Sequence, residues 1–267
     1  MTITVTALHT TPVKALRIGA VDAIELGPGG AAGDRAFYVV DEDGAMVNGK
    51  RLGVLQTVTA DYDRSREVLG LRLGDGERIE APVQLGARID TTFFGAPRRA
   101  RLLDGPLSQA LSGHAGRDLR LVSSGPALDR GREGAISLVS RASLQRLAGA
   151  EDPDGSRETG SGPVDGRRFR MLIEVDGVPA HAEDRWVGHE LEIGGARVRI
   201  HGNVGRCVTT TRGPESGEVD LPTLKMLATY RMDAETTEPL PFGVHGEVLQ
   251  SGTVRVGDEL RVDPPPR

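Results

Sequence analysis

The sequence predicts a mainly β protein. Short segments of alternating apolar and polar residues recur along the chain, and residues 2–8 (TITVTAL) are the first of them. The chain has 36 glycines among 267 residues, which suits many tight turns between short strands. Segments with helical spacing are few and short. We therefore expect a β-barrel in the N-terminal half, a second β-barrel in the C-terminal half, and a few short helices.

The N-terminal half reads as a run of short strands separated by turns. Turn signals rich in Gly, Pro and Asp stand at residues 27–30, 41–44 and 74–76. Between them, apolar or alternating segments predict strands at residues 2–8, 21–26, 36–40, 55–62 and 68–73. This strand density favours a barrel or closed sandwich.

The middle of the chain mixes helix and strand signals. Residues 106–112 have the spacing of a short helix, and 120–122 and 136–139 read as strands. Ser140 precedes a segment with helical spacing, residues 141–147, where a serine can act as N-cap. Residues 149–166 are polar and rich in Gly, Pro and Asp, so we predict a long surface loop, with a lid over a site as the alternative.

The C-terminal third contains the clearest helix. Residues 167–175 (RRFRMLIEV) predict a strand that carries three arginines. Residues 191–200 (LEIGGARVRI) alternate around a Gly-Gly turn, which indicates a hairpin. Residues 220–230 place a proline near the first turn of an apolar helix, and 244–249 and 252–262 predict the closing strands.

The single cysteine, Cys207, follows the predicted hairpin and precedes a turn at 212–218. Arg206 stands beside it, and a neighbouring cation lowers the pKa of a thiol and favours the thiolate that binds soft metals and attacks electrophiles. The alternative is a buried cysteine that serves as a small apolar side chain. A functional Cys207 must be accessible at the floor of a cleft, whereas a packing cysteine must be sealed in a core.

Composition excludes several classes of function. A net charge of −5 argues against non-specific binding of nucleic acid, and one cysteine excludes an internal disulfide and a four-cysteine iron–sulfur cluster in this chain. The N-terminus has no apolar run of signal-peptide type, and no segment approaches a transmembrane helix. We therefore expect a cytoplasmic protein with no membrane and no nucleic-acid partner.

Other polar residues have structural and functional interpretations. Glu183 and Asp184 can form a general acid/base pair or can fix a loop by hydrogen bonds. Trp186 suits a core position or a substrate platform, and His201 suits a strand end or a base for the cysteine. The glycines at 27–33 form neither a GxGxxG motif nor a P-loop, so nothing here indicates nucleotide binding.

Residues 206–231 (RCVTTTRGPESGEVDLPTLKMLATYR) resemble the signature of MOSC domains, the family named after the C-terminal region of molybdenum-cofactor sulfurase. Upstream, 168–170 (RFR) and 182–186 (AEDRW) fit the same family. The N-terminal half is similar to the β-barrel that often precedes this domain, through the motifs PVK, GDR and VDEDG at residues 12–14, 33–35 and 40–44. The resemblance covers nearly the whole chain and implies an N-terminal domain at 1–118 and a MOSC domain at 119–267.

The overall arrangement resembles the amidoxime-reducing group of this family. That resemblance implies that Cys207 ligates molybdenum in a pterin cofactor (molybdopterin), and soft thiolate suits such a metal. It also implies cofactor binding by residues that match the family motifs or offer phosphate contacts, namely Lys14, Arg35, Ser140, Arg170, Arg206 and Thr210. If both halves build one site, Lys14, Arg35 and Arg170 should converge on a cleft with Cys207.

The sequence departs from the family pattern at two positions. Ala15 stands where a serine commonly follows the motif lysine, and Leu172 stands where an asparagine is common. An alanine and a leucine side chain make no hydrogen bond. These two residues bear on which cofactor or substrate the pocket takes.

Three functions remain open from the sequence. The first is a molybdenum-dependent oxidoreductase that reduces N-oxygenated small molecules, with electrons from a separate donor protein. The second is a sulfurtransferase or sulfur carrier, in which Cys207 carries a persulfide that Arg206 stabilises during cofactor or natural-product biosynthesis. The third is a carrier that binds and protects the pterin without catalysis.

Overall fold

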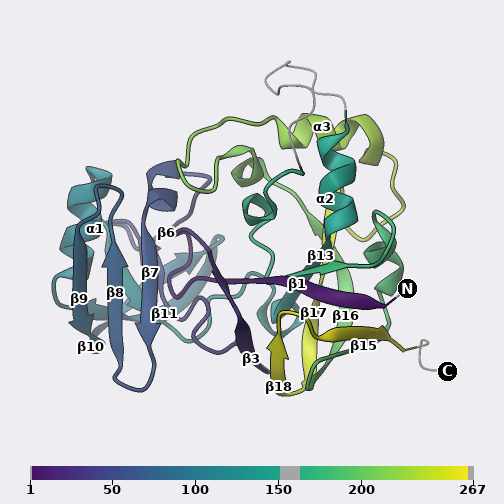
Figure 1. The fold of residues 1–267 in the computed structure, drawn as a ribbon. Coiled ribbons are helices and arrows are strands. Elements are labelled where there is room, and N and C mark those ends of the chain that lie inside the picture. The colour runs from purple at the N-terminus through teal and green to yellow at the C-terminus, as the bar shows by residue number, and fades with distance from the viewer. Residues whose placement is uncertain (1, 151–162, 264–267) are drawn as a thin grey trace.

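The protein has two β-rich halves joined side by side, as the computed structural model shows for residues 2–150 and 163–263 (Figure 1). Strands make up 43% and helices 19%, so the mainly β fold class is confirmed. The N-terminal half, at the left of Figure 1, carries β5–β12 and α1, and the half at the right carries the other two α-helices.

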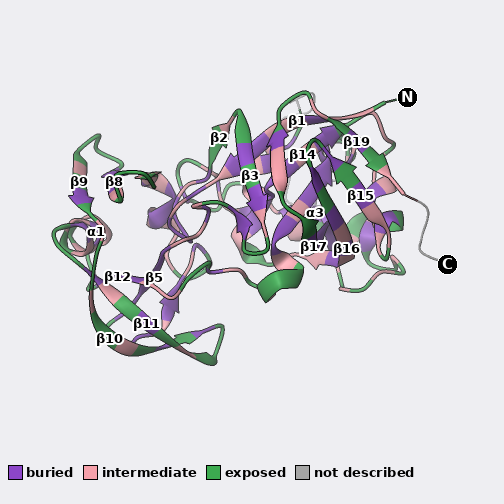
Figure 2. Cartoon of the chain, turned by 90° about the horizontal axis from the view of Figure 1, so that it is seen from below, coloured by how far each residue is buried: buried purple, intermediate pink, exposed green. Residues whose placement is uncertain are grey.

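A closed barrel of seven strands forms the right-hand half. Its strands follow the order β14-β13-β17-β16-β15-β19-β1, and pairing of β14 with β1 closes the ring. The strands of this barrel are β1 (Ile3–Thr10), β13 (Ile136–Ser140), β14 (Ile173–Asp176), β15 (Glu190–Ile193), β16 (Ala196–Gly205), β17 (Pro241–Gln250) and β19 (Glu259–Val262). The short strand β2 (Gly19–Val21) extends the sheet beside β1. Inward-facing aliphatic side chains fill the barrel. The buried residues of its strands are the purple parts of the ribbon in Figure 2.

Strand β1 belongs to the barrel although it opens the chain. Val5 pairs with Val175 of β14, and Ile3 pairs with Leu260 of β19. Residues 3–10 therefore pack with the C-terminal half, whereas the sequence assigned them to an N-terminal domain ending at 118. The boundary between 118 and 119 stays a prediction.

The N-terminal half packs two sheets around a shared aliphatic core. The five-stranded sheet contains β10 (Gln84–Phe93), β11 (Ala96–Asp104), β12 (Arg120–Ser123), β5 (Tyr38–Val40) and β6 (Met46–Val47). The three-stranded sheet contains β7 (Thr59–Asp63), β8 (Val68–Arg72) and β9 (Arg78–Pro82). A third small sheet contains β18 (Gly252–Arg255), β3 (Ala23–Gly27) and β4 (Gly30–Ala31), so it unites segments from the two ends of the chain.

The three predicted helices are present. They are α1 (Leu107–Ala115), α2 (Arg141–Ala148) and α3 (Thr223–Arg231). The hydroxyl of Ser140 accepts a hydrogen bond from the Ser143 amide, which is the expected N-cap of α2. Short 3-10 turns are η1 (Gly53–Thr57), η2 (Gly131–Gly134), η3 (Gly166–Phe169), η4 (Ala182–Trp186) and η5 (Val208–Thr211).

The predicted strand at 167–175 is wrong in its first half. The arginines lie on η3 and its C-cap, and β14 begins only at Ile173. The Asp165 carboxylate accepts a hydrogen bond from the Arg167 amide at 2.9 Å and so caps a helical turn. Likewise, the predicted strand at 55–62 begins as η1 and becomes β7 only at Thr59.

The long loop predicted at 149–166 falls largely on residues 151–162, which lie outside the described residues. Residues 264–267 also lie outside the described residues. None of the helices formed by residues 2–150 and 163–263 has the length and apolar character that crossing a membrane requires.

Candidate functional site

A cavity of about 480 Å³ lies between the two halves, and both contribute to its walls. Its volume is in the range of small-molecule and cofactor sites. The cations predicted from the sequence, Lys14, Arg35 and Arg170, line it together with Cys207. The predicted convergence of these four residues on one cleft is therefore confirmed as geometry.

Cys207 is exposed, so its sulfur is accessible rather than sealed in a core. Strand β16 ends at Gly205, and Cys207 then occupies the N-cap position of η5. Its Sγ lies 3.5 Å from the hydroxyl oxygen of Thr209. The thiol thus stands at the end of a strand that is hydrogen-bonded into the barrel, which fixes the position of the backbone that carries it.

Arg206 points into the protein instead of toward a carboxylate. Its guanidinium donates hydrogen bonds to the main-chain carbonyls of Phe242 and Phe169, the latter at 3.0 Å. It also lies 5.3 Å from the centre of the Phe169 ring. Burial lowers the pKa of Arg206 to about 9, and a negative charge on the Cys207 sulfur acts in the opposite direction.

Arg170 and Arg35 are held side by side by the backbone. Both have left-handed φ values, 54° and 49°, which are uncommon for residues other than glycine. Arg35 donates a hydrogen bond to the Arg170 carbonyl at 3.1 Å, while Arg170 donates one to the Leu16 carbonyl at 2.8 Å. Burial, followed by the nearby charge of Arg35, lowers the pKa of Arg170 to about 10.

Lys14 forms an ion pair with Asp129, a residue that the sequence analysis did not single out. Lys14 is 8% exposed, and burial lowers its pKa while Asp129 acts to raise it. The ammonium also lies 5.6 Å from the ring centres of both Phe93 and Phe94. Asp129 therefore places one negative charge in a wall that is otherwise cationic.

Among the residues that the structure describes, six cationic side chains and one carboxylate line the cavity. The cations are Lys14, Arg35, Arg130, Arg168, Arg170 and Arg206. Four of them have carboxylate partners: Lys14 with Asp129, Arg35 with Asp34, Arg130 with Glu238, and Arg168 with Asp220.

No carboxylate of a described residue pairs with Arg170 or Arg206, whose hydrogen-bond partners are carbonyls and a thioether. Two buried positive charges without counter-ions are costly, and a bound anion relieves that cost.

Thr210 and Ser140 have other partners in this structure. The Thr210 hydroxyl contacts the Thr223 hydroxyl at 2.7 Å and donates to the Cys207 carbonyl at 3.1 Å, so it holds the cysteine loop against α3. Thr210 still lines the cavity, but Ser140 is absent from the described lining residues. Ser140 is fully buried, and its amide donates to Glu183. A phosphate contact by Ser140 stays a prediction, and the observed role of Ser140 is the cap of α2.

The two departures from the family pattern have different positions. Ala15 lines the cavity and has a φ of 84°, a conformation that is strained for a residue with a Cβ. Leu172 is 2% exposed and packs in the barrel core. Its amide donates to the Ser137 hydroxyl at 3.0 Å, and Ser137 lines the cavity. Leu172, at the position where the family commonly has asparagine, offers no side-chain hydrogen bond, and the neighbouring Ser137 provides a hydroxyl at the cavity wall.

The acidic-tryptophan element has structural contacts. The Glu183 carboxylate accepts hydrogen bonds from Ser140 and Ser143, and Asp184 pairs with Arg231 at 2.6 Å. Trp186 is 7% exposed and packs in the barrel core. None of these residues is among the described residues that line the cavity. The loop-fixing interpretation is the one that this geometry supports.

The lining residues that the sequence did not predict include Asp129, Phe94 and His245. The ring Nδ1 of His245 lies 2.7 Å from the Glu133 carbonyl, so Nδ1 is the protonated nitrogen and Nε2 is left as acceptor. Burial lowers the pKa of His245. The segment 126–134 carried no motif, and only its contact with Lys14 across the fold reveals Asp129. The glycine that follows Phe94 is a turn signal in the sequence, and it could have indicated the hairpin that carries Phe94.

The donor set suits a metal that arrives in a cofactor. Among residues 2–150 and 163–263, no three His, Cys, Asp or Glu side chains are grouped closely enough to hold a metal ion. A metal beside Cys207 would have this one thiolate from the protein and would take its other ligands elsewhere. Arg170 and Arg206, which have no carboxylate partner among the described residues, would suit the phosphate of an organic cofactor, so the residues present fit a phosphate-bearing metal cofactor.

Comparison with known proteins agrees with this organisation. The model of the MOSC domain matches residues 114–261, and that of the MOSC N-terminal beta barrel domain matches residues 2–101. Mitochondrial amidoxime reducing component 2 of Bos taurus is 28% identical over 284 residues, which cover 96% of this chain and 82% of that protein. Mitochondrial amidoxime-reducing component 1 of Xenopus laevis is 27% identical, with coverage of 96% and 81%.

Among solved structures, the YUAD protein from Bacillus subtilis is 15% identical, with a TM-score of 0.49, and the match covers 98% of this chain and 96% of that one. The two family matches together span both halves of the fold and include Lys14, Arg35, Arg170 and Cys207. This chain is a member of the MOSC domain family with the N-terminal β-barrel domain of that family.

Proposed function

We propose that this protein binds a molybdenum–pterin cofactor in the cleft and reduces N-oxygenated compounds. The observation that carries the proposal is an exposed thiol, Cys207, in one cavity with Arg170 and Arg206, which have no carboxylate partner among the described residues. Such a cavity favours an anion and offers one soft metal ligand. The names of the similar amidoxime-reducing proteins support the choice of substrate class.

The residues of this chain would divide the binding of the cofactor. Cys207 would ligate the metal, and Arg206 would contribute positive charge to the anion site. Arg170, with Arg35 beside it, would neutralise the phosphate through charge-assisted hydrogen bonds. When bound, the cofactor supplies a metal that exchanges two electrons with substrates.

The proposed reaction breaks one N–O bond and forms one N–H bond. It consumes two electrons and two protons, and the oxygen leaves as water. A separate donor protein supplies the electrons, since one cysteine is too few for a four-cysteine cluster in this chain. Among the described lining residues, His245 offers an imidazole whose Nε2 can exchange a proton with the cavity.

The test combines a metal measurement with a turnover assay. Freshly purified protein should contain close to one molybdenum per chain by mass spectrometry of metals. Assayed with a chemical reductant, it should convert an N-hydroxy compound to its N–H product. Molybdenum without turnover would support the carrier function instead, and protein that lacks molybdenum after expression in a cofactor-producing host would contradict both.

A second candidate is sulfur transfer, which the exposure of Cys207 favours. The Cys207 thiolate would attack the outer sulfur of a persulfide donor, the S–S bond of the donor would break, and the donor thiolate would leave, so that Cys207 carries the persulfide. A nucleophilic acceptor would then attack the outer sulfur, the S–S bond would break, and the Cys207 thiolate would leave, with no net electron transfer. Sulfur released by cyanide from metal-free protein would support this function, and its absence after incubation with a sulfur donor would contradict it.

A further inference from the structure

The hairpin β10–β11 turns through two residues, Phe94 and Gly95. Strand β10 ends at Phe93, and β11 begins at Ala96. The φ values are 50° at Phe94 and 83° at Gly95, so both central residues lie in the left-handed region, as a type I′ turn requires. Such turns strongly favour Asn-Gly, whereas this chain has Phe-Gly.

Phenylalanine is energetically unfavourable at this position. A bulky side chain with positive φ is a true conformational outlier, and burial of the ring does not offset the strain, because Phe94 is 57% exposed. The tip of the hairpin belongs to the mostly exposed part of the N-terminal half in Figure 2. Strained residues of this kind persist where the surrounding structure holds them in place, and they cluster at active sites and ligand-binding segments.

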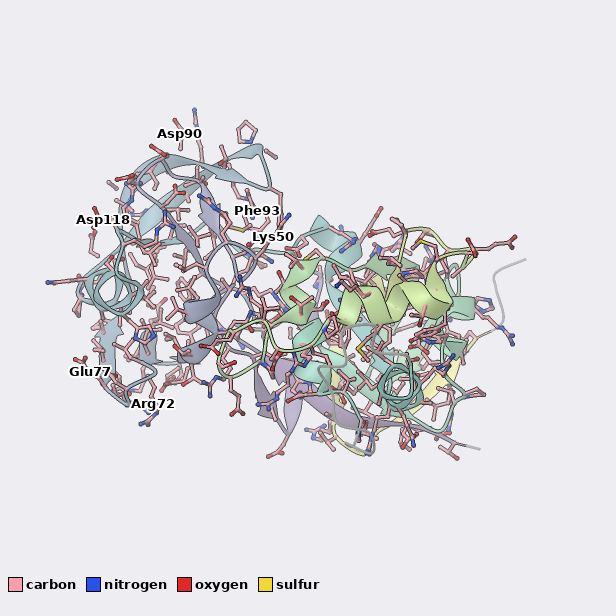
Figure 3. The ribbon with its side chains drawn as sticks, turned by 90° about the horizontal axis from the view of Figure 1, so that it is seen from above. Lys50, Arg72, Glu77, Asp90, Phe93 and Asp118 are labelled. Atoms are coloured by element: carbon pink, nitrogen blue, oxygen red, sulfur yellow. The ribbon has the colours of Figure 1, made fainter. Side chains whose placement is uncertain are left out.

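The side chain of Phe94 lies at the wall of the cavity. Phe94 lines the cavity that also contains Cys207, and Lys14 lies 5.6 Å from its ring centre. Its ring meets the Phe93 ring edge to face, with centres 5.1 Å apart. Phe93 is 7% exposed, and Figure 3 places it on the side of the N-terminal half that faces the barrel. The buried Phe93 and Lys14 therefore hold an otherwise exposed aromatic face at the cavity.

We propose that Phe94 is a specificity residue, which contacts the flat apolar part of the substrate while its N–O group points toward Cys207. This inference rests on the proposed function and names its substrate class: N-oxygenated compounds in which the reacting group is attached to an aromatic or other planar conjugated system. The wall of the cavity carries several cationic side chains and the aromatic ring of Phe94, so a substrate with a polar head and a planar apolar tail matches it. Aromatic pairs add binding free energy beyond the area that they bury.

The experiment compares two probes that share one N-hydroxy group, benzohydroxamic acid and acetohydroxamic acid. Calorimetric Kd values are measured on purified protein of known molybdenum content. Wild type should bind the aryl acid more tightly, and Phe94→Ala should weaken aryl binding about five- to tenfold while it changes alkyl binding less than twofold. In turnover of an aryl N-hydroxy substrate, the loss should be found in KM and not in kcat.

Three further variants separate contact from folding. Phe94→Tyr keeps the aromatic face and should retain aryl preference. Phe94→Asn suits the turn and should keep or raise the melting temperature, yet bind the aryl acid as weakly as Phe94→Ala. Val256→Ala is the control. It removes an apolar side chain that is 45% exposed and lies outside the cavity lining, and it should change neither affinity.

The outcomes distinguish this inference from the proposed function. Equal affinity of wild type for the two acids, no binding of either, or an aryl preference that survives in Phe94→Ala would overturn the role of Phe94. An aryl preference that depends on Phe94 in a protein without reductase activity would leave the contact standing and would defeat the reductase.

Discussion

Arg35 donates a hydrogen bond to the main-chain carbonyl of Arg170, with a distance of 3.1 Å between nitrogen and oxygen. Arg35 comes from the segment between β4 and β5, and Arg170 directly follows η3. This bond joins the two halves of the fold at the cavity and keeps two cations adjacent. Their mutual repulsion, together with burial, makes the site more favourable for an anion than either arginine alone.

Cys207→Ser should abolish reductase activity and reduce molybdenum content to background. A serine hydroxyl is hardly ionised at neutral pH and is a poor ligand for a soft site. Because Cys207 is exposed, the melting temperature should stay within about 1 °C of wild type. Metal analysis, an activity assay and a thermal scan check this. A variant with full metal and full activity would show that the thiol is dispensable.

Asp129→Asn should tighten the binding of a simple dianion such as sulfate about three- to tenfold. The substitution removes the carboxylate that pairs with Lys14, and the gain is moderate because Asp129 is half-exposed and screened by water. Calorimetry gives the Kd values. Asp118→Asn serves as control, since Asp118 is exposed at the far end of the N-terminal half in Figure 3. Equal affinities in wild type and Asp129→Asn would mean that Lys14 takes no part in anion binding.

Sulfate affinity should fall as the pH rises from 8 to 10. Burial lowers the pKa of Arg206 to about 9 and that of Arg170 to about 10, so both lose positive charge in this window while sulfate keeps its charge. The sign follows because the anion binds the protonated form, which is lost as the pH rises. Kd values at several pH values test this. Arg206→Gln should bind sulfate more weakly at pH 7 and show a flatter profile, and an identical profile would contradict the assignment.

Ser140→Ala should lower stability rather than ligand affinity. The variant loses the N-cap of α2, which costs about 1 kcal/mol, or about 2–4 °C in melting temperature. Sulfate affinity should remain within twofold, because Ser140 is buried away from the described cavity wall. Thermal unfolding and calorimetry decide the matter. A large loss of sulfate affinity at unchanged stability would support the phosphate contact that the sequence predicted for the Ser140 hydroxyl.

The sequence predicted those parts of the site that short motifs carry. Lys14, Arg35, Arg170 and Cys207 were found because each lies within a family motif, and the fold brings all four to one cavity. The strand expected at 167–175 failed because the spacing of its residues suits a strand, while the Asp165 cap stabilises a helical turn instead. Partners distant in sequence were also missed. The pairing of Asp129 with Lys14 depends on how two loops meet in space, and periodicity carries no information about it.

Because β1 supplies one strand of the barrel, the ring closes only when segments that lie far apart in the sequence pair with each other. Ile3 cannot form its contact until Leu260 is in place. The N-terminal half can fold earlier during synthesis, while β1 has only the short strand β2 beside it and keeps its other edge exposed. Its late, long-range closure predicts slow final folding, and temporary shielding by a chaperone would protect the waiting strand from pairing with other chains.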